Sequence, residues 1–265
     1  MLVVVGELIN SMRPKVGRMI AEREETRIRD LARRQHEAGA AVIDLNAEQS
    51  LERELADLLW LIEVVEDELG QDVRLGIDTS DAGVMEAAIA KCSTPPWMNS
   101  VSNETSKVSL IELAAERGCD VIGLAMGEAG MPKNADERFA EAAALVDKCD
   151  AAGLDRGKLY VDLVCMSVAS SPEQGRELLT AVRRLSSELC VQPLVALSNV
   201  SFGLPNRRLV NRAFLPMLIE AGLAGAILDP TDPAVIETIC AANALLGTDE
   251  FCMEYIQHHR KSQAT

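Results

Sequence analysis

The sequence contains few histidines and few aromatic residues, and its cysteines are widely spaced along the chain. The three histidines, His36, His258 and His259, stand apart from the seven cysteines, which form no Cys-x-x-Cys pair. Zinc and iron sites in proteins are built from clusters of histidine and cysteine, and the sequence has no such cluster. We therefore expect no bound metal. The same shortage leaves no base for a Ser-His-Asp triad. Because the number of cysteines is odd, we expect free thiols in a reducing compartment.

Long apolar runs and basic clusters are also lacking. No run reaches the length of about 18 residues that a membrane-spanning helix needs, and residues 1–7 lack the basic lead of a signal peptide. The net charge is −15, from 41 acidic and 26 basic residues. Such a surface repels nucleic acids and anionic membranes. We therefore expect a cytoplasmic protein that has neither as a partner.

Short apolar runs that end in a polar residue recur along the chain, and they alternate with stretches long enough for one helix each. Apolar residues make up 48% of the sequence and aromatic residues only 3%, which suits aliphatic parallel strands buried on both faces. The predicted strands are Leu2–Glu7, Ala41–Asn46, Val73–Asp78, Trp97–Asn99, Asp120–Met126, Lys158–Asp162, Leu194–Asn199 and Ala224–Asp229. The predicted helices are Thr26–Ala38, Leu51–Leu69, Asp81–Ala90, Val108–Glu116, Asp136–Ala152, Pro172–Leu189, Asn211–Ala221 and Pro233–Leu246.

This alternation predicts an α/β fold, a single (β/α)8 TIM barrel, which commonly takes about 250 residues. A doubly wound sheet also alternates strands and helices, but it normally carries a Gly-rich phosphate turn after its first strand. The segment Gly6-Glu7-Leu8-Ile9-Asn10 is no such turn. We expect one domain over residues 1–265, with a polar C-terminal tail from about residue 248 that is frayed.

Polar side chains close most of the predicted strands, as an active site at the carboxyl ends of barrel strands requires. They are Glu7, Asn46, Asp78, Asn99, Asp162, Asn199 and Asp229. Taken singly, Asp78 and Asp162 are equally well explained as caps of the loops that follow. Taken together with Asn99, they can accept hydrogen bonds from adjacent N–H and NH2 groups while the amide donates to a carbonyl. The pyrimidine edge of a pterin has that layout.

Several motifs of the sequence resemble those of the pterin-binding barrels. They are Gly6-Glu7-Leu8-Ile9-Asn10, Asp44-Leu45-Asn46, Ile77-Asp78-Thr79-Ser80, Asn99-Ser100, Gly123-Leu124-Ala125-Met126, and Leu197-Ser198-Asn199-Val200-Ser201 with Asn206-Arg207. The nearest branch is the methyltetrahydrofolate:corrinoid (iron-sulfur) protein methyltransferases. The resemblance runs from Val3 to about Phe251, and its most specific part is the segment around Asn199.

The resemblance implies a barrel, usually a homodimer, whose mouth binds tetrahydrofolate or 5-methyltetrahydrofolate as its substrate. A methyl group passes between the pterin N5 and the cobalt of a corrinoid (cobalamin) carried by a partner protein. Matched by motif, the residues that hold the pterin ring are Asp78, Asn99 and Asp162, and the catalytic residue beside N5 is Asn199. Arg207 matches an arginine lining the same mouth, and the supporting positions are Glu7, Asn46 and Ser198.

The chain departs from the family pattern at Leu8, where arginine is common, at Leu163, where proline is frequent, and at Phe202, where close relatives carry a polar side chain. Leu8 and Phe202 favour the demethylation systems, in which the methyl group passes from a methylcorrinoid protein to tetrahydrofolate. Two alternatives stay open. One is a dihydropteroate synthase-like enzyme, which would need a lysine or arginine at a late strand end to bind pyrophosphate. The other is a non-catalytic folate-binding subunit.

Overall fold

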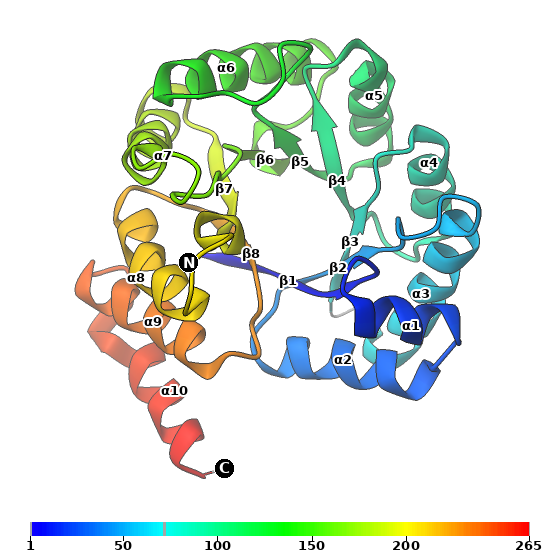
Figure 1. Cartoon of the computed structure of the whole chain (residues 1–265), viewed down its shortest axis with the longest axis horizontal. Coiled ribbons are helices and arrows are strands. Elements are labelled where there is room, and N and C mark those ends of the chain that lie inside the picture. The colour runs from blue at the N-terminus through cyan, green and yellow to red at the C-terminus, as the bar shows by residue number, and fades with distance from the viewer. Residues whose placement is uncertain (1, 71–72, 265) are drawn as a thin grey trace.

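The computed structural model describes residues 2–70 and 73–264, and it shows a closed barrel of eight parallel strands (Figure 1). Strands that follow one another along the chain are neighbours in the barrel, and the last strand closes it against the first. The predicted (β/α)8 fold is thereby confirmed. The strands are β1 (Val3–Asn10), β2 (Val42–Asn46), β3 (Arg74–Asp78), β4 (Trp97–Ser102), β5 (Asp120–Leu124), β6 (Leu159–Asp162), β7 (Gln192–Ala196) and β8 (Gly225–Leu228).

Helices cover the outside of the barrel (Figure 1). They are α1 (Pro14–Ala21), α2 (Glu25–Glu37), α3 (Glu54–Leu69), α4 (Ala82–Lys91), α5 (Val108–Arg117), α6 (Ala135–Ala151), α7 (Gln174–Arg184), α8 (Arg207–Glu220), α9 (Pro233–Leu245) and α10 (Met253–Ala264). Local sequence sets their ends. Asp81, for example, begins α4 by accepting hydrogen bonds from the backbone N–H groups of Gly83 and Val84 at 2.8 and 2.9 Å.

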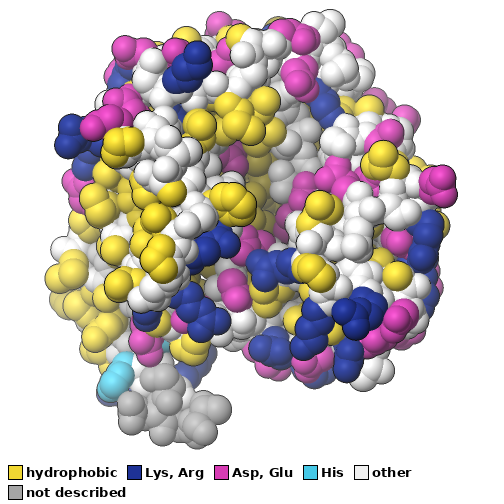
Figure 2. Space-filling view, in the orientation of Figure 1, with side chains coloured by type: hydrophobic (Ala, Val, Ile, Leu, Met, Phe, Trp, Pro, Cys, Tyr) yellow, Lys and Arg dark blue, Asp and Glu magenta, His cyan; other side chains and the backbone are white. Residues whose placement is uncertain are grey.

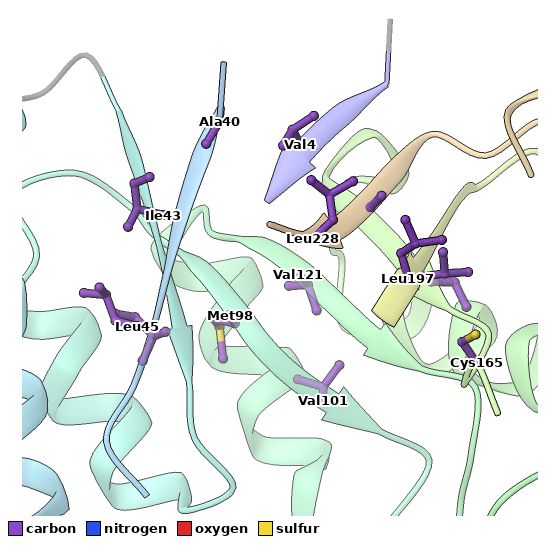
Figure 3. Close-up of a cluster of buried hydrophobic side chains, with 14 of the residues drawn as sticks. Val4, Ala40, Ile43, Leu45, Met98, Val101, Val121, Cys165, Leu197 and Leu228 are labelled. Atoms are coloured by element: carbon purple, nitrogen blue, oxygen red, sulfur yellow. The ribbon is translucent and has the colours of Figure 1, made fainter. Parts of the chain in front are cut away.

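The strands bury both faces in two separate apolar clusters. Outward-facing side chains such as Ile43, Met98 and Val121 pack between the sheet and the helices (Figure 3). Inward-facing side chains fill the barrel interior, where the rings of Trp97 and Tyr160 lie 4.4 Å apart between centroids. The interior cluster consists of Val5, Val42, Trp97, Ile122, Tyr160, Leu194 and Ile227. It forms a closed apolar floor below the carboxyl ends of the strands.

The structure differs from the predicted elements after β7. That strand ends at Ala196, and the chain then forms a 3-10 helix, η4 (Leu197–Ser201), so Asn199 lies on a helical turn and not at a strand end. Leu197 and Val200 are both buried, and residues three apart share one side of a 3-10 helix. The turn therefore buries its apolar side and exposes Asn199 toward the barrel mouth.

Helix α1 was not predicted, and several helix boundaries differ by a few residues. Pro172 lies before α7, which begins at Gln174, and α8 begins at Arg207, earlier than the predicted Asn211. The polar tail was expected to be frayed, but α10 is a helix that contacts α9 and extends away from the barrel (Figure 1). No helix within residues 2–70 and 73–264 is long and apolar enough to cross a membrane.

Candidate active site

A cavity of about 470 Å³ lies at the carboxyl ends of the strands, directly above the apolar floor. Six predicted site residues line it: Glu7, Asp78, Asn99, Asp162, Ser198 and Asn199. The other lining residues are Asn10, Met12, Arg13, Asp44, Ser100, Leu124, Ala196 and Ile227. Below, the β2–β6 side means Asp44, Asp78, Asn99 and Asp162, and the β7–β1 side means Glu7, Ser198 and Asn199. The structure thus brings most of the predicted site together.

On the β2–β6 side, Asn99 and Asp44 form a buried pair. The Asn99 Nδ2 atom donates to both carboxylate oxygens of Asp44 at 3.3 Å. Burial raises the pKa of Asp44 to about 7, and the negative charge of Glu7 adds to the rise, while the Asn99 hydrogen bond opposes it. This pairing fixes the Asn99 amide, so its oxygen is the group left for a ligand.

Asp78 is held from behind by Asn46. The Asn46 Nδ2 atom donates to the Oδ2 atom of Asp78 at 3.2 Å, and the Ser11 hydroxyl donates to the Asn46 Oδ1 atom at 2.9 Å. Burial, followed by the charges of Asp44 and Glu48, raises the pKa of Asp78 well above its usual value. Asn46 does not line the cavity, and it acts on a ligand only through Asp78.

Asp162 is fixed by the turn that follows β6. Its Oδ1 atom accepts a hydrogen bond from the backbone N–H of Val164 at 2.8 Å. The buried Arg138 side chain holds the same turn by donating to the carbonyl oxygens of Leu163 at 2.8 Å and Val164 at 3.2 Å. Burial raises the pKa of Asp162 to about 6, although the Val164 hydrogen bond and the Arg138 charge oppose the rise. This carboxyl therefore titrates close to neutral pH.

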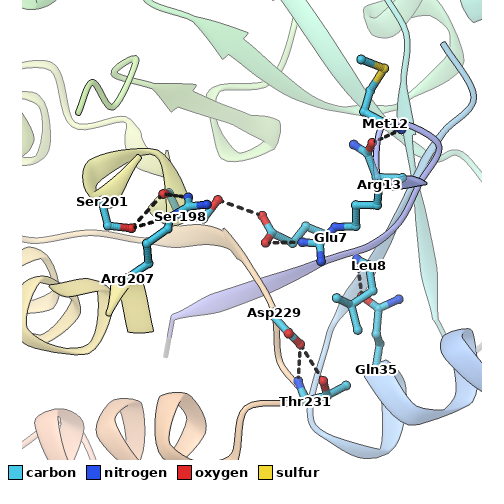
Figure 4. Close-up of polar contacts among 11 residues, drawn as sticks. Glu7, Leu8, Met12, Arg13, Gln35, Ser198, Ser201, Arg207, Asp229 and Thr231 are labelled. Carbon is cyan, nitrogen blue, oxygen red and sulfur yellow. Dashed lines mark hydrogen bonds and ion pairs between the residues drawn. The ribbon is translucent and has the colours of Figure 1, made fainter. Parts of the chain in front are cut away.

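On the β7–β1 side, the polar groups are more loosely joined (Figure 4). Glu7 forms an ion pair with Arg13 at 2.7 Å, and the Ser198 hydroxyl lies 3.5 Å from its other carboxylate oxygen. Burial raises the pKa of Glu7, while the Arg13 charge is the largest effect that opposes the rise. Asn199 is exposed at the cavity wall, and no hydrogen bond fixes its side chain among the described residues.

Arg207 supports η4 from outside the cavity wall. Its NH2 atom donates to the Ser198 carbonyl oxygen at 2.6 Å, and its Nε atom donates to the Ser201 hydroxyl at 3.1 Å (Figure 4). Arg207 is not among the residues that line the cavity. Arg207 was predicted to line the mouth, but its contacts hold the backbone next to Asn199 instead.

Sequence reasoning missed Asp44 and Arg13. Asp44 lies between Val42 and Asn46 on β2, and residues two apart on a strand face the same side. Asp44 is therefore expected to face inward together with Asn46, and this alternation is the sequence signal that could have identified it. Arg13 precedes α1, and no pattern in the sequence marks it. The predicted strand-closing residue Asp229 lies outside this cavity and accepts hydrogen bonds from the Thr231 N–H and hydroxyl at 2.9 and 2.7 Å.

The sequence matches the family described as pterin binding enzyme over residues 12–229. The chain belongs to this family. This pterin-binding barrel is 29% identical to the methylcorrinoid:tetrahydrofolate methyltransferase of Eubacterium limosum, over 99% of this chain and 97% of that protein. It is also 29% identical to the methionine synthase of Mycobacterium leprae over 86% of this chain, which spans only 20% of that longer protein.

Solved structures share the fold of this pterin-binding barrel. The dihydropteroate synthase of Yersinia pestis with a pterine-sulfa conjugate superposes on it with a TM-score of 0.68 and 19% identity, over 93% of this chain and 94% of that one. At this identity the likeness concerns the fold alone. Among the described residues, no group of three or more histidine, cysteine, aspartate or glutamate side chains is arranged to hold a metal ion.

The cavity wall suits a pterin chemically. The carboxylates of Asp78 and Asp162 and the amide of Asn99 line the same space, and carboxylates of this kind can accept hydrogen bonds from ring N–H and NH2 groups. Hydrogen bonds to ionised acceptors are stronger than those between neutral groups. The family match and the side chains therefore agree on the class of ligand.

Proposed function

We propose that this protein transfers a methyl group from the cobalt of a methylcorrinoid protein to N5 of tetrahydrofolate. The observation that carries the proposal is the composition of the cavity, which combines pterin-edge acceptors on one side with an exposed amide, Asn199, on the other. The full-length similarity to a methylcorrinoid:tetrahydrofolate methyltransferase supports this reaction and this direction.

In the proposed complex, the pyrimidine edge of the pterin meets Asp78, Asn99 and Asp162. The ring then lies over the apolar floor, and N5 lies on the opposite side of the ring system, toward the β7–β1 side. Asn199 is placed there by η4, with Ser198 and Glu7 beside it in the same wall. Asp44 supports this edge by accepting hydrogen bonds from Asn99, which orient the Asn99 amide.

The transfer moves one methyl cation equivalent. The lone pair of N5 attacks the methyl carbon as the cobalt–carbon bond breaks, and both electrons of that bond stay on cobalt, which is reduced from Co(III) to Co(I). N5 becomes positively charged and then loses its proton. Asn199 can orient its amide toward N5 as the charge changes, an interaction that differs between ground and transition states. Glu7, whose pKa is raised, stands on the same side to accept the proton through Ser198.

The direct test is an anaerobic assay with methylcob(III)alamin and tetrahydrofolate. We expect the cobalt spectrum to change to that of cob(I)alamin, and a carbon-13 methyl label to appear on N5 of the folate. The Asn199→Ala variant should lose this conversion and keep folate binding. The proposal is wrong if the wild type binds tetrahydrofolate but transfers no label, both from methylcob(III)alamin and from methylated corrinoid carrier proteins. That outcome would leave the non-catalytic folate-binding subunit.

A dihydropteroate synthase reaction is less well supported by this cavity. That chemistry must bind a pyrophosphate leaving group, which calls for available basic side chains. Among the residues that line the described cavity, Arg13 is the only cation, and it is paired with Glu7 at 2.7 Å. We therefore expect no dihydropteroate from p-aminobenzoate and 6-hydroxymethyl-dihydropterin pyrophosphate, and its formation would favour this alternative.

A further inference from the structure

We propose that Arg138 is a positioning residue of the pterin site, which acts on the ligand through the turn after β6 that carries Asp162. This inference rests on the proposed function, because it takes Asp162 as an acceptor for the pyrimidine edge of the pterin. Arg138 lies on α6 and is not among the residues that line the cavity. It therefore adds a residue that controls folate affinity without touching the folate.

The burial of Arg138 is unusual for a charged side chain. Figure 2 shows lysine and arginine side chains on the surface of the molecule and along the lower side of the hollow, whereas Arg138 is 0% exposed. The acceptors of its guanidinium are two backbone carbonyls and a side-chain amide, all of them neutral. Within the described residues its NH1 atom has no partner. Because a buried charge on neutral acceptors destabilises a fold, its placement favours a role in the site.

The two carbonyls belong to a turn of uncommon backbone conformation. The Nε atom of Arg138 donates to the Leu163 carbonyl at 2.8 Å, and its NH2 atom donates to the Val164 carbonyl at 3.2 Å. Val164 has a φ of 54°, in the left-handed region that a β-branched residue rarely adopts. Such a conformation persists only where its surroundings hold it. Arg138 does so by bonding two successive carbonyls.

The same turn orients Asp162. The Val164 N–H donates to the Asp162 Oδ1 atom at 2.8 Å, so one residue is bonded to Asp162 through its N–H and to Arg138 through its carbonyl. Among the described residues the Asp162 Oδ2 atom has no hydrogen-bond partner, and Asp162 lines the cavity. Loss of Arg138 therefore frees the turn and lets the Asp162 carboxylate rotate away from a ligand.

Gln174 holds the guanidinium in place from the other side. Its Oε1 atom accepts from the NH2 atom of Arg138 at 2.7 Å, and its Nε2 atom donates to the Lys133 carbonyl at 2.9 Å. Lys133 lies just before α6, and Gln174 begins α7. The guanidinium is thereby fixed between α7 and the turn, and it links the segments that follow β5 and β6.

The Arg138 charge also acts on Asp162 directly. The titratable groups around Arg138 are Cys165, Glu177, Glu137 and Asp162. Glu137 and Glu177 each accept a backbone N–H group at 2.7 Å, and burial raises the pKa of the Cys165 thiol to about 12, which keeps it neutral. Burial raises the pKa of Asp162 to about 6, and the Arg138 charge opposes the rise. Arg138 therefore favours the ionised carboxylate that accepts the ligand hydrogen bonds.

The test is a double-mutant cycle in folate binding. Dissociation constants for tetrahydrofolate are measured by calorimetry from about pH 5 to about pH 9, the range around this pKa. The proteins are the wild type, Arg138→Met, Asp162→Ala and the variant with both changes. Arg138→Lys keeps the charge but cannot hold both carbonyls as a planar guanidinium does. The control is Arg183→Met, because Arg183 is exposed on α7 and pairs with Glu220 at 2.6 Å.

In the wild-type background we expect Arg138→Met to weaken tetrahydrofolate binding by about three- to thirtyfold at neutral pH, less than Asp162→Ala does. The midpoint of the pH dependence should move to higher pH, because a charge that favours the ionised carboxylate is lost. In the Asp162→Ala background the same change should alter affinity by less than about twofold. Arg138→Lys should keep the wild-type midpoint and recover part of the affinity. Arg183→Met should match the wild type in both measurements.

The proposal is overturned if Arg138→Met weakens binding by the same factor in both backgrounds, since Arg138 would then act on the fold or the whole pocket. Binding of Arg138→Met equal to that of the wild type also overturns it. If Arg138→Met does not fold, Gln174→Glu takes its place in the cycle, because it leaves Arg138 present and opposes its charge. A midpoint that rises only when Asp162 is present then supports the proposal, and an unchanged midpoint overturns it. Failure of the methyl-transfer proposal shows separately, as absence of transfer by a wild type that binds folate.

Discussion

The two sides of the cavity differ in how firmly their polar side chains are held. On the β2–β6 side, Asp44 and Asp162 are buried and Asp78 is half-buried. Each of these carboxyl groups is fixed by a partner: Asp44 by Asn99, Asp78 by Asn46, and Asp162 by the Val164 backbone. On the β7–β1 side, the closest link to Glu7 from η4 is the 3.5 Å contact of Ser198, and Asn199 is exposed. One side holds its groups still, and the other leaves its amide free to turn.

This difference teaches where binding and chemistry are separated. Fully paired polar groups in a buried wall are costly to assemble and recognise one ligand edge, which suits binding of the pterin ring. A group that must respond to a change of charge at N5 cannot be locked in one hydrogen bond, which suits Asn199. The predictions below test this division, beginning with the largest expected effect.

Asn199→Ala should slow methyl transfer and leave folate binding nearly unchanged. We expect kcat for methyl transfer to fall by about a hundredfold or more, the usual cost of removing one hydrogen-bonding group that acts in the transition state. The dissociation constant for tetrahydrofolate should change by less than about threefold, because Asn199 makes few ground-state contacts. Equal losses in kcat and in affinity would contradict the role at N5. Steady-state kinetics and calorimetry on the same preparation give both values.

Asp78→Ala and Asp162→Ala should weaken folate binding and leave the chemical step nearly unchanged. Each removes charge-assisted hydrogen bonds worth about 1.5–3 kcal/mol, so we expect tetrahydrofolate to bind about ten- to a hundredfold more weakly. Asp147→Ala, at an exposed position of α6, is the matched control and should bind normally. Unchanged affinity in both cavity variants would show that the pterin edge lies elsewhere.

Asp162→Asn should stabilise the protein without ligand, although it harms binding. Burial raises the pKa of Asp162 from 3.8 to about 6, so the folded state holds its proton more tightly than the unfolded state does. Stability from this group is therefore present below pH 3.8 and is lost as the pH rises through 6. At about pH 8 the variant should gain up to about 3 kcal/mol in the free energy of unfolding, and little at about pH 4. Urea unfolding at both values checks this, and an equal gain at the two would refute it.

The pH dependence of folate binding should show the smallest effect and sharpen the comparison. The pKa values are about 7 for Asp44 and about 6 for Asp162, and the ionised form of Asp162 accepts the ligand hydrogen bonds. Affinity should be full at about pH 8 and should fall with decreasing pH, by up to about tenfold per unit below pH 6. Asp162→Asn should flatten this profile. A wild-type affinity that is constant from pH 8 to pH 5 would contradict the assignment.

Sequence patterns predicted the barrel and most of the cavity because both follow from strand geometry. Parallel strands all end at one rim, so a polar residue that closes each apolar run must come near the others. Asp78, Asn99 and Asp162 were found in this way, and all three line the cavity. Asp44 was missed since it lies within a strand, although its alternation with Asn46 predicts that it faces inward.

The loop conformations around the cavity could not be predicted from the sequence. The apolar run of β7 continues through Leu197, and only the burial of Val200 three residues later reveals the 3-10 turn that presents Asn199. Arg13 lies in the loop before α1 and forms an ion pair with Glu7. The guanidinium of Arg207 donates hydrogen bonds to a backbone oxygen and a hydroxyl oxygen of η4. Loop conformations of this kind have no periodic signal, so they need the structure.

The measurement that tests the division of labour most directly is a single-turnover methyl transfer with increasing tetrahydrofolate, in the wild type, Asp78→Ala and Asn199→Ala. The account predicts that saturating folate restores the Asp78→Ala rate to near the wild-type value, because that variant loses only binding. It predicts that no concentration restores Asn199→Ala. If saturation rescues Asn199→Ala, or leaves Asp78→Ala as slow as Asn199→Ala, binding and chemistry do not lie on separate sides of this cavity.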